Sequence, residues 1–195
     1  MSTISALSNV HSEGQFGDIE NKNEKDLLKI TEKTDLLVVQ IVQYKNSTFS
    51  LDELSIDKLK LIDKPLSVVT NENTRILWNG PRNWLITSND NKLIEQIIEK
   101  FNSNDFAVTD LSHSKAIIEI EGKYAKEVLK KGCPFNFNEL NKNSCLNSTY
   151  NGISITVDII ADKPDRIRIF SLRSFGESMY HSFTDASLEF GYIAK

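Results

Sequence analysis

Short apolar runs rich in β-branched residues alternate with turn-forming residues, and this pattern restricts the fold more than any other feature of the chain. Two pairs of runs flank strong hairpin turns, Asn-Gly-Pro-Arg at residues 79–82 and Asn-Gly at residues 151–152. Because hairpins join neighbouring strands that run in opposite directions, the pattern predicts largely antiparallel sheets. The predicted strands are residues 35–44, 75–78, 83–86, 106–109, 115–121, 146–150, 153–160 and 166–172.

Two segments between these strands carry apolar residues at helical spacing. Residues 93–101 follow Asp90, whose carboxylate can accept hydrogen bonds from the first free amides of a helix. Residues 124–131 are followed by Gly132, a residue type that often ends a helix in a left-handed conformation. Both segments are therefore predicted to be helices with one buried face.

A third helix is predicted at residues 174–183. Ser174 and Glu177 have the spacing of a capping box, in which each side chain bonds the backbone amide of the other residue. Helices set between hairpin-paired strands define an α+β fold. We expect largely antiparallel sheets with the helices packed on one face.

The first 25 residues differ in composition from the rest of the chain. They are rich in Ser, Asn, Glu and Gly and show no apolar periodicity, so residues 1–25 are predicted to form a mobile polar arm that a partner could order. Residues 26–195 are predicted to form a single α+β domain, or two small lobes that divide near residue 104.

Composition excludes several classes of protein. The chain has 23 basic and 27 acidic residues, a formal net charge of -4 and no long basic run, which argues against nucleic-acid binding. No apolar stretch approaches the roughly 20 residues that cross a bilayer, and the first residues do not have the pattern of a signal peptide. We expect a cytoplasmic protein without membrane contact.

Side chains that could carry chemistry are few and scattered. The histidines are His11, His113 and His181, none in a metal-ligand spacing. Cys133 and Cys145 form no CxxC pair, and Cys133, between Gly132 and a proline, is predicted to be a small buried sulfur. The chain contains neither a dinucleotide-binding glycine motif nor a P-loop. We therefore assign no catalytic, cofactor-binding or metal-binding residue.

Two polar clusters resemble reactive sites without having the required spacing. Asp110 precedes Ser112 and His113, but a catalytic triad is assembled by the fold and not by adjacency along the chain. We interpret Asp110 as a turn residue that accepts hydrogen bonds from the backbone that follows it. Asp162 and Asp165 flank a proline in a loop and are interpreted as loop carboxylates.

Four residues are candidates for contact with a partner protein. Trp78 and Trp84 lie on the two arms of one predicted hairpin, and Arg173 and Phe175 lie at the start of the last predicted helix. Tryptophan and arginine are enriched at protein interfaces. The alternatives are that the tryptophans belong to the core and that Arg173 is an ordinary surface residue.

Five motifs, in order along the chain, resemble the gamma subunit of heterotetrameric sarcosine oxidase. They are LWNGPRNWLI at residues 77–86, VTDLSHS at 108–114, GKYAKEVL at 122–129, KGCPFNF at 131–137 and RSFGES at 173–178. The resemblance covers residues 76–183, and the motifs are moderately specific only as a set. It implies a fold similar to the folate-binding domain of aminomethyltransferase-type proteins.

The resemblance also implies a function. In that family the complex oxidatively demethylates sarcosine to glycine, and the methyl carbon passes to tetrahydrofolate or leaves as formaldehyde. The alpha, beta and delta subunits would be the partners, and the complex would hold FAD, FMN, NAD and zinc. The gamma subunit is not known to hold any of these cofactors, so this chain is expected to support assembly of the flavin-bearing subunits.

Three departures from the family pattern bear on this expectation. Asn136 stands where the family often has Asp, and Gly176 where it often has Ala. Asp158 is offset from the aspartate that folate-binding relatives use, so that role is not transferred to it. The substrate is therefore expected only within the class of N-methyl amino acids. Two alternatives stay open: a stand-alone folate-binding or folate-dependent one-carbon transfer protein, and a scaffold for another complex.

Overall fold

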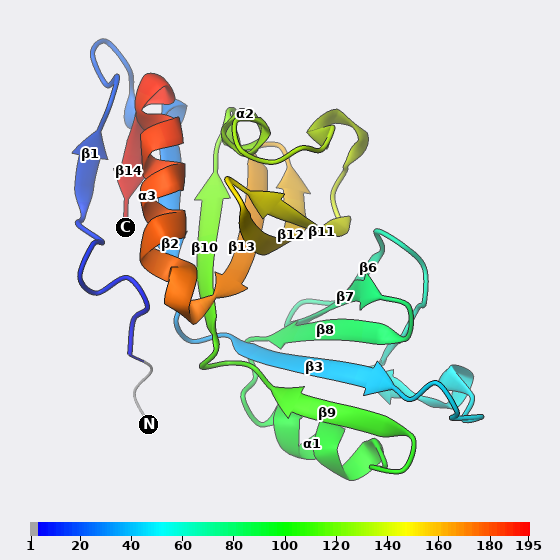
Figure 1. The fold of residues 1–195 in the computed structure, drawn as a ribbon. Coiled ribbons are helices and arrows are strands. Elements are labelled where there is room, and N and C mark those ends of the chain that lie inside the picture. Colours follow the sequence, from blue (N-terminus) through cyan, green and yellow to red (C-terminus); the bar gives the residue numbers. More distant parts are fainter. Residues whose placement is uncertain (1–3) are drawn as a thin grey trace. The chain divides into compact units, whose positions relative to one another are not determined.

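The computed structural model describes residues 4–195, which form two compact units (Figure 1). Unit 1 comprises Met1–Thr34, Ser114–Lys142 and Asn147–Lys195. Unit 2 comprises Asp35–His113 and Asn143–Leu146. The lobe boundary expected near residue 104 falls inside unit 2, and the chain instead passes between the units near residues 34, 113, 142 and 146.

Unit 1 is built on a seven-stranded sheet. Its strands, in spatial order, are β1 (Gly14–Phe16), β14 (Tyr192–Ala194), β2 (Leu28–Glu32), β10 (Lys115–Glu121), β13 (Asp165–Leu172), β12 (Ile153–Asp162) and β11 (Cys145–Tyr150). The pairing of β14 with β2 is parallel, whereas β1–β14, β2–β10, β10–β13 and β13–β12 are antiparallel. The sheet therefore pairs β1, from the N-terminal part of the chain, with β14 near its C-terminus.

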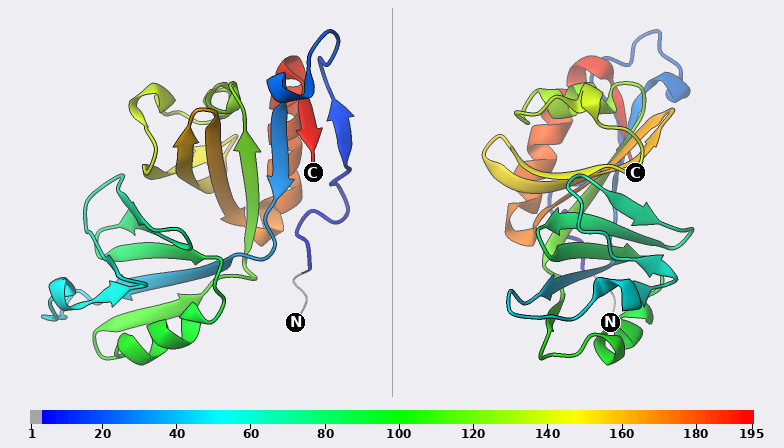
Figure 2. Two further views of the ribbon diagram at one scale, coloured as in Figure 1. Left: turned by 180° about the vertical axis from the view of Figure 1, so that it is seen from behind. Right: turned by 90° about the vertical axis from the view of Figure 1, so that its right-hand side faces the viewer.

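Two α-helices pack on this sheet. They are α2 (Ala125–Lys130) and α3 (Gly176–Ser187), which contact each other and both contact β13 (Figures 1 and 2). Apolar side chains of α3, including Met179 and Phe183, are fully buried. Short 3-10 turns complete unit 1: η1 (Glu24–Asp26), η3 (Phe137–Glu139), η4 (Arg173–Phe175) and η5 (Leu188–Phe190).

Unit 2 is built on a five-stranded antiparallel sheet. Its strands, in spatial order, are β6 (Val68–Thr70), β7 (Thr74–Gly80), β8 (Asn83–Ser88), β3 (Leu37–Gln43) and β9 (Phe106–Asp110). The helix α1 (Leu93–Lys100), the 3-10 turn η2 (Leu51–Glu53) and a small hairpin of β4 (Ser55–Ile56) and β5 (Leu59–Lys60) complete it. Side chains from β3, β7, β8, β9, α1 and the β4–β5 region form one apolar core.

The predicted fold class is confirmed: the structure is α+β, with mainly antiparallel sheets. All eight predicted strands and all three predicted helices are present, with shifts of a few residues at their ends. The strands β1, β2, β4, β5, β6 and β14 were not predicted. All of these except β2 have only two or three residues, so their sequences are too short to show a period.

The predicted capping box at the third helix is wrong. A 3-10 turn occupies residues 173–175, the helix α3 begins at Gly176, and no side chain caps it. The Glu177 carboxylate instead accepts a hydrogen bond from the side-chain amide of Asn9 at 3.0 Å. A Cβ at position 176 would lie 3.0 Å from the Cβ of Ala116, so the glycine here permits close packing of helix on sheet.

The helix α2 ends just before Gly132, as predicted, but this glycine does not adopt a left-handed conformation. A Cβ at this position would lie 2.8 Å from ring atoms of Tyr150, a side chain that is itself buried against Phe183. We expect Gly132→Ala to lower the free energy of unfolding by about 1–3 kcal/mol through overpacking. A denaturation cycle with Tyr150→Leu tests this: the double variant should cost less than the sum of the single variants, and simple additivity would contradict the contact.

Part of the segment predicted as a mobile arm packs on unit 1. Leu7 is fully buried, the Glu32 carboxylate accepts hydrogen bonds from the Ser5 hydroxyl and the Ala6 amide, and β1 pairs with β14. A Cβ at Gly17 would lie 2.2 Å from the backbone oxygen of Leu188, so only glycine permits this approach. Mobility of residues 1–25 in solution stays a prediction, and residues 1–3 lie outside the described residues.

Candidate interaction surfaces

The three histidines do not form a metal-ligating group in the described part of the chain, although His11 and His181 both lie near the Tyr180 ring. His11 packs edge-on against Tyr180 in unit 1, His113 is exposed in unit 2, and His181 is exposed on α3. Among residues 4–195 no group of three or more metal-ligating side chains comes together. No helix in this described range is long and apolar enough to span a bilayer.

Both cysteines are buried and unoxidised, and each is in a different unit. The Cys133 thiol donates to the Ser148 hydroxyl at 3.1 Å in unit 1, so its predicted burial is confirmed. The Cys145 thiol lies 3.2 Å from the backbone oxygen of Ser67 and 3.3 Å from that of Trp78 in unit 2. Each sulfur therefore serves packing and local hydrogen bonding.

The Asp110 turn has the predicted hydrogen bonds. The Asp110 carboxylate accepts from the Ser112 amide at 2.9 Å and from the Ser112 hydroxyl at 2.6 Å. The Ser112 oxygen in turn accepts from the Val38 amide at 3.0 Å, which ties the turn to β3. The exposed His113 is not part of these bonds, so the geometry is that of a structural turn.

The loop carboxylates Asp162 and Asp165 gather around one lysine. The Lys126 ammonium lies 3.5 Å from Asp165 and 3.9 Å from Asp162, and it also donates to the backbone oxygen of Leu140. Burial raises the pKa of Asp165 above its ordinary value, and the Lys126 charge opposes that rise. The cluster therefore ties α2 to the β12–β13 turn.

A buried phenol also has a shifted pKa. Tyr150 donates to the backbone oxygen of Val128 at 2.9 Å, and burial, together with the charges of Asp185 and Cys133, raises its pKa to about 12. The folded state therefore keeps this proton after the unfolded state has lost it. The stability that this tyrosine contributes should be complete below about pH 10 and should fall as the pH rises through about 12.

Tyr150→Phe tests this linkage. At neutral pH the variant should lose about 1 kcal/mol of stability, because the Val128 carbonyl loses its donor. Urea unfolding of both proteins across the alkaline range should show the difference between them shrinking above about pH 10. A difference that stays constant with pH would contradict the shifted pKa.

A row of alternating charges crosses one face of the sheet of unit 1. The Glu119 carboxylate accepts hydrogen bonds from Arg166 Nε at 2.6 Å and from Arg168 Nε and Nη2 at 3.1 and 3.0 Å. Glu121 extends the row, 3.8 Å from Arg166 and 3.3 Å from Lys29. Glu119 and Arg168 are buried, so these ion pairs belong to the interior of the protein.

Asp158, to which no folate role was transferred, lies at the far end of this row. It is fully buried on β12 and is opposite Arg168 in the strand register. The sequence showed neither this juxtaposition nor the row itself, because its members come from segments nearly 50 positions apart. The strand register alone reveals it.

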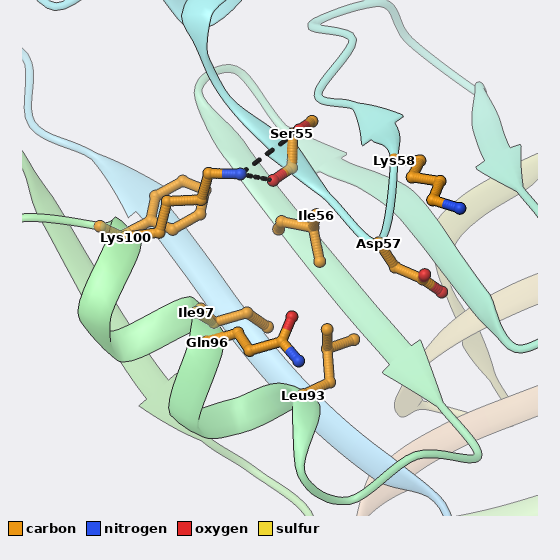
Figure 3. Close-up of a pocket in the computed structure, with 9 residues that line it drawn as sticks. Ser55, Ile56, Asp57, Lys58, Leu93, Gln96, Ile97 and Lys100 are labelled. Atoms are coloured by element: carbon orange, nitrogen blue, oxygen red, sulfur yellow. Dashed lines mark hydrogen bonds between the residues drawn. The ribbon is translucent and has the colours of Figure 1, made fainter.

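A pocket of about 300 Å³ lies in unit 2 between α1 and the β4–β5 hairpin (Figure 3). Its apolar wall includes Leu93 and Ile97, which belong to the core. Two of its charged groups already have partners: Lys100 donates to the Ser55 backbone oxygen at 2.6 Å, and the Asp57 carboxylate accepts from Asn71 and Thr74. Those bonds from Asn71 and Thr74 lower the pKa of Asp57, which favours its ionised form.

Trp84 is a core residue, which corrects its inclusion among the interface candidates. Its side chain is fully buried in unit 2, and its indole Nε1 donates to the backbone oxygen of Ile62 at 3.0 Å. The reason is its place in the sheet: β8 lies between β7 and β3, and the ring packs in the apolar core with side chains of these strands, of α1 and of the β4–β5 region. It cannot contact a partner chain in this conformation.

Trp78 is partly exposed and remains an interface candidate. Its indole Nε1 donates to Asp63 Oδ1 at 2.7 Å, and Asp63 Oδ2 accepts from the Arg82 amide at 3.1 Å. Both carboxylate oxygens are therefore used to fix the end of the β7–β8 hairpin. The register places Trp78 opposite Trp84 but beyond the last residue with which β6 pairs.

Arg173 and Phe175 lie together at the start of α3 in unit 1. Phe175 is 46% exposed and the neighbouring Leu172 is 50% exposed. The guanidinium of Arg173 donates to the backbone oxygens of Ile4 and Ser5 at 2.6 and 3.1 Å. Arg173 thus holds the N-terminal segment, and the exposed apolar side chains beside it form a second candidate surface.

Two solved structures share the fold of this chain. Aminomethyltransferase T of the glycine cleavage system from Bartonella henselae matches with a TM-score of 0.63 and 11% identity, over 88% of this chain and 48% of that chain. A chain of heterotetrameric sarcosine oxidase from Corynebacterium sp. U-96, solved in complex with pyrrole 2-carboxylate, matches with a TM-score of 0.76 and 22% identity, over 87% of each chain. The fold is therefore of the folate-binding aminomethyltransferase type, as predicted.

One curated relative is similar to this chain in sequence. The gamma subunit of sarcosine oxidase from Corynebacterium sp. (strain U-96) is 28% identical over 120 residues, which are 60% of this chain and 58% of the relative. The matched region thus spans about 58% of the length of the relative. No protein-family model matches the sequence. The resemblance to the gamma-subunit family, first indicated by the five motifs, is confirmed.

Proposed function

We propose that this chain is the non-catalytic gamma-type subunit of a sarcosine oxidase complex. The complex would oxidatively demethylate sarcosine, or a closely related N-methyl amino acid, to the primary amino acid. The methyl carbon would pass to tetrahydrofolate or leave as formaldehyde. The single observation that carries this proposal is the sequence similarity to a sarcosine oxidase gamma subunit together with a shared fold over 87% of both chains.

The side chains of the chain are consistent with this role. Several groups that could act as acids, bases, nucleophiles or ligands are used in internal contacts: Cys133 bonds Ser148, Ser112 bonds Asp110 in its own turn, and Glu119 and Arg168 form an ion pair in the interior. Catalysis requires groups positioned to meet a reacting atom. What the chain offers to solvent instead is partly exposed aromatic and apolar surface on both units.

The proposed partners are the alpha, beta and delta subunits of the complex, in the cytoplasm. FAD, FMN, NAD and zinc would be held by those chains, which would also use tetrahydrofolate. The flavins would supply the oxidation of the amine, with oxygen as the electron acceptor. The contribution of this chain would be to stabilise the assembly by covering apolar surface of the larger subunits.

Co-expression tests the proposal. The chain, tagged at its C-terminus, should co-purify with the flavin-bearing subunits of the same organism as a yellow complex that forms peroxide from sarcosine. The chain expressed alone should be colourless and inactive. Recovery of the tagged chain without any flavin subunit, or turnover of sarcosine by the isolated chain, would refute it.

A stand-alone folate protein is the second candidate, because the fold is shared with aminomethyltransferase T. Fold alone does not define function. Calorimetric titration of the isolated chain with tetrahydrofolate separates the two possibilities. We expect no saturable heat, whereas binding at micromolar concentration would favour the folate protein.

A further inference from the structure

One part of unit 2 combines exposed apolar side chains with a fixed polar framework. Asp63 bonds both the indole of Trp78 and the amide of Arg82, and the Arg82 guanidinium donates to the backbone oxygens of Tyr44 and Lys45 at 3.3 and 2.9 Å. Three segments, at residues 44–45, 62–66 and 78–82, are thereby held together. We call this region the hairpin surface, defined by Tyr44, Ile62, Leu66, Trp78 and Arg82.

The hairpin surface exposes several large apolar side chains. Tyr44, Ile62 and Leu66 are 43%, 44% and 40% exposed, and Trp78 is partly exposed beside them. Scattered single apolar residues are normal on a surface, but clusters rimmed by polar residues mark interaction sites. Tyrosine, tryptophan and arginine together are also the residue types that dominate binding energy at protein interfaces.

Backbone strain is present at the same place. Among residues 4–195, seven residues other than glycine have a positive φ, and four of them are Asn or Asp, which tolerate it. The other three are Lys58, Leu66 and Arg82, with φ of 64°, 63° and 54°. Two of these three lie on the hairpin surface. A bulky residue in a left-handed conformation is costly, and such strain concentrates at functional positions.

The charges around the hairpin surface indicate the chemistry of its partner. Lys45, Lys64 and Arg82 are exposed, and in the described part of the chain the ammonium groups of Lys45 and Lys64 form no ion pair. Both carboxylate oxygens of Asp63 already accept hydrogen bonds. The Arg82 guanidinium uses only Nη1 for its bonds to the backbone oxygens of Tyr44 and Lys45. Arg82, Asp63 and Asp52 also line a depression of about 430 Å³.

We infer that the hairpin surface docks a partner protein chain that presents a carboxylate among apolar side chains. The carboxylate would pair with the unused donors of Arg82, flanked by Lys45 and Lys64, and the apolar side chains would cover Tyr44, Ile62, Leu66 and Trp78. The inference rests on the proposed function, in which this chain is a subunit. It adds which face of the subunit is covered and what kind of surface covers it.

Leu66→Asn is the discriminating variant. Asparagine adopts the left-handed conformation readily, so the isolated variant should be at least as stable as the wild type in a thermal melt. Loss of the leucine side chain should nevertheless weaken association with the purified complex of the other subunits by about tenfold or more. A variant that simply folded less well would lose both thermal stability and association. Unchanged or higher stability together with weaker association therefore indicates a role in docking.

Lys58→Asn is the matched control. Lys58 has nearly the same φ as Leu66 and is exposed, but it lies on the β4–β5 hairpin, outside the hairpin surface. Its replacement relieves the same kind of strain and should leave association unchanged. Ile98→Asn provides a second control, because this α1 residue is 61% exposed and apolar but is not part of the surface.

Charge reversal tests the electrostatic part. Lys45→Glu combined with Lys64→Glu should weaken association by about tenfold at low salt, and the difference from the wild type should shrink as salt is added. If the wild-type chain assembles but Leu66→Asn and the double charge variant both bind within about twofold of it, the inference is overturned and the proposed function stands. If the wild-type chain itself does not assemble with flavin-bearing subunits, the proposed function fails first.

Discussion

Trp84→Ala is expected to lower the free energy of unfolding by about 3–5 kcal/mol, the range for removing a large aromatic side chain from a packed core. The side chain is fully buried and packs in the core of unit 2 with residues that include Ile41 and Ile86. The loss also leaves the backbone oxygen of Ile62 without the indole donor that lies 3.0 Å away. Urea unfolding followed by fluorescence or circular dichroism gives the measurement, and the remaining Trp78 retains an intrinsic fluorescence signal.

Trp78→Ala is the matched control, because the two tryptophans are opposite each other in the register of the same hairpin. Trp78 is partly exposed, so its replacement should cost less than about 2 kcal/mol. A second variant, Trp84→Phe, keeps most of the volume and removes the indole donor, which should cost about 1–3 kcal/mol. Equal losses for the two alanine variants would contradict the assignment of Trp84 to the core and Trp78 to the surface.

These tryptophans also show how far sequence reasoning reaches. The turn at residues 79–82 and its apolar flanks predicted the hairpin and placed one tryptophan on each arm. The sequence of the hairpin does not show which of its two tryptophans is buried and which is exposed. The distinction comes from the sheet order, in which β8 is flanked by β7 and β3, whereas β7 is flanked on its other side only by the three-residue β6. Strand order depends on contacts distant in sequence, so local patterns do not reveal it.

The same limit applies to the ends of the chain. Residues 1–25 contain no periodic apolar pattern, and the structure nevertheless places Leu7 in the interior and pairs β1 with β14. A single buried leucine and a three-residue strand produce no period. Gly17 and Gly191 mark this contact, but only the structure shows why they are glycines. A Cβ on Gly17 would lie 2.2 Å from the backbone oxygen of Leu188, and a Cβ on Gly191 would lie 2.3 Å from that of Asp18. The contacts between chain ends are therefore visible only in three dimensions.

The candidate site was predictable in its residue types but not in its location. The motif at residues 77–86 identified Trp78 and Arg82 as part of a distinctive hairpin. It did not indicate Asp63, which joins these two residues from a loop that contains no motif. It also did not indicate Leu66, whose positive φ is a property of the folded backbone. A pattern finds residues that are close in sequence, whereas a surface is made from several segments.

Glu119→Gln is expected to lower the free energy of unfolding by about 3–5 kcal/mol, because it removes one partner of a buried ion pair. Glu119 is 6% exposed and Arg168 is 8% exposed, so water cannot replace the lost carboxylate around Arg168. The amide of glutamine offers only one neutral acceptor where the carboxylate accepted from two guanidinium groups. The measurement is equilibrium unfolding in urea at neutral pH.

Glu121→Gln is the control that isolates burial as the cause. Glu121 lies two residues further along β10, on the same face, and it pairs with Lys29 and Arg166 at 3.3 and 3.8 Å. Its side chain is 31% exposed, however, and exposed ion pairs contribute only about 0–1 kcal/mol. The loss for Glu121→Gln should therefore be small and should shrink further in high salt, whereas the loss for Glu119→Gln should depend little on salt. Similar losses and similar salt dependence for both variants would mean that the row of charges is solvated, and that the sheet face of unit 1 that carries it is open to water.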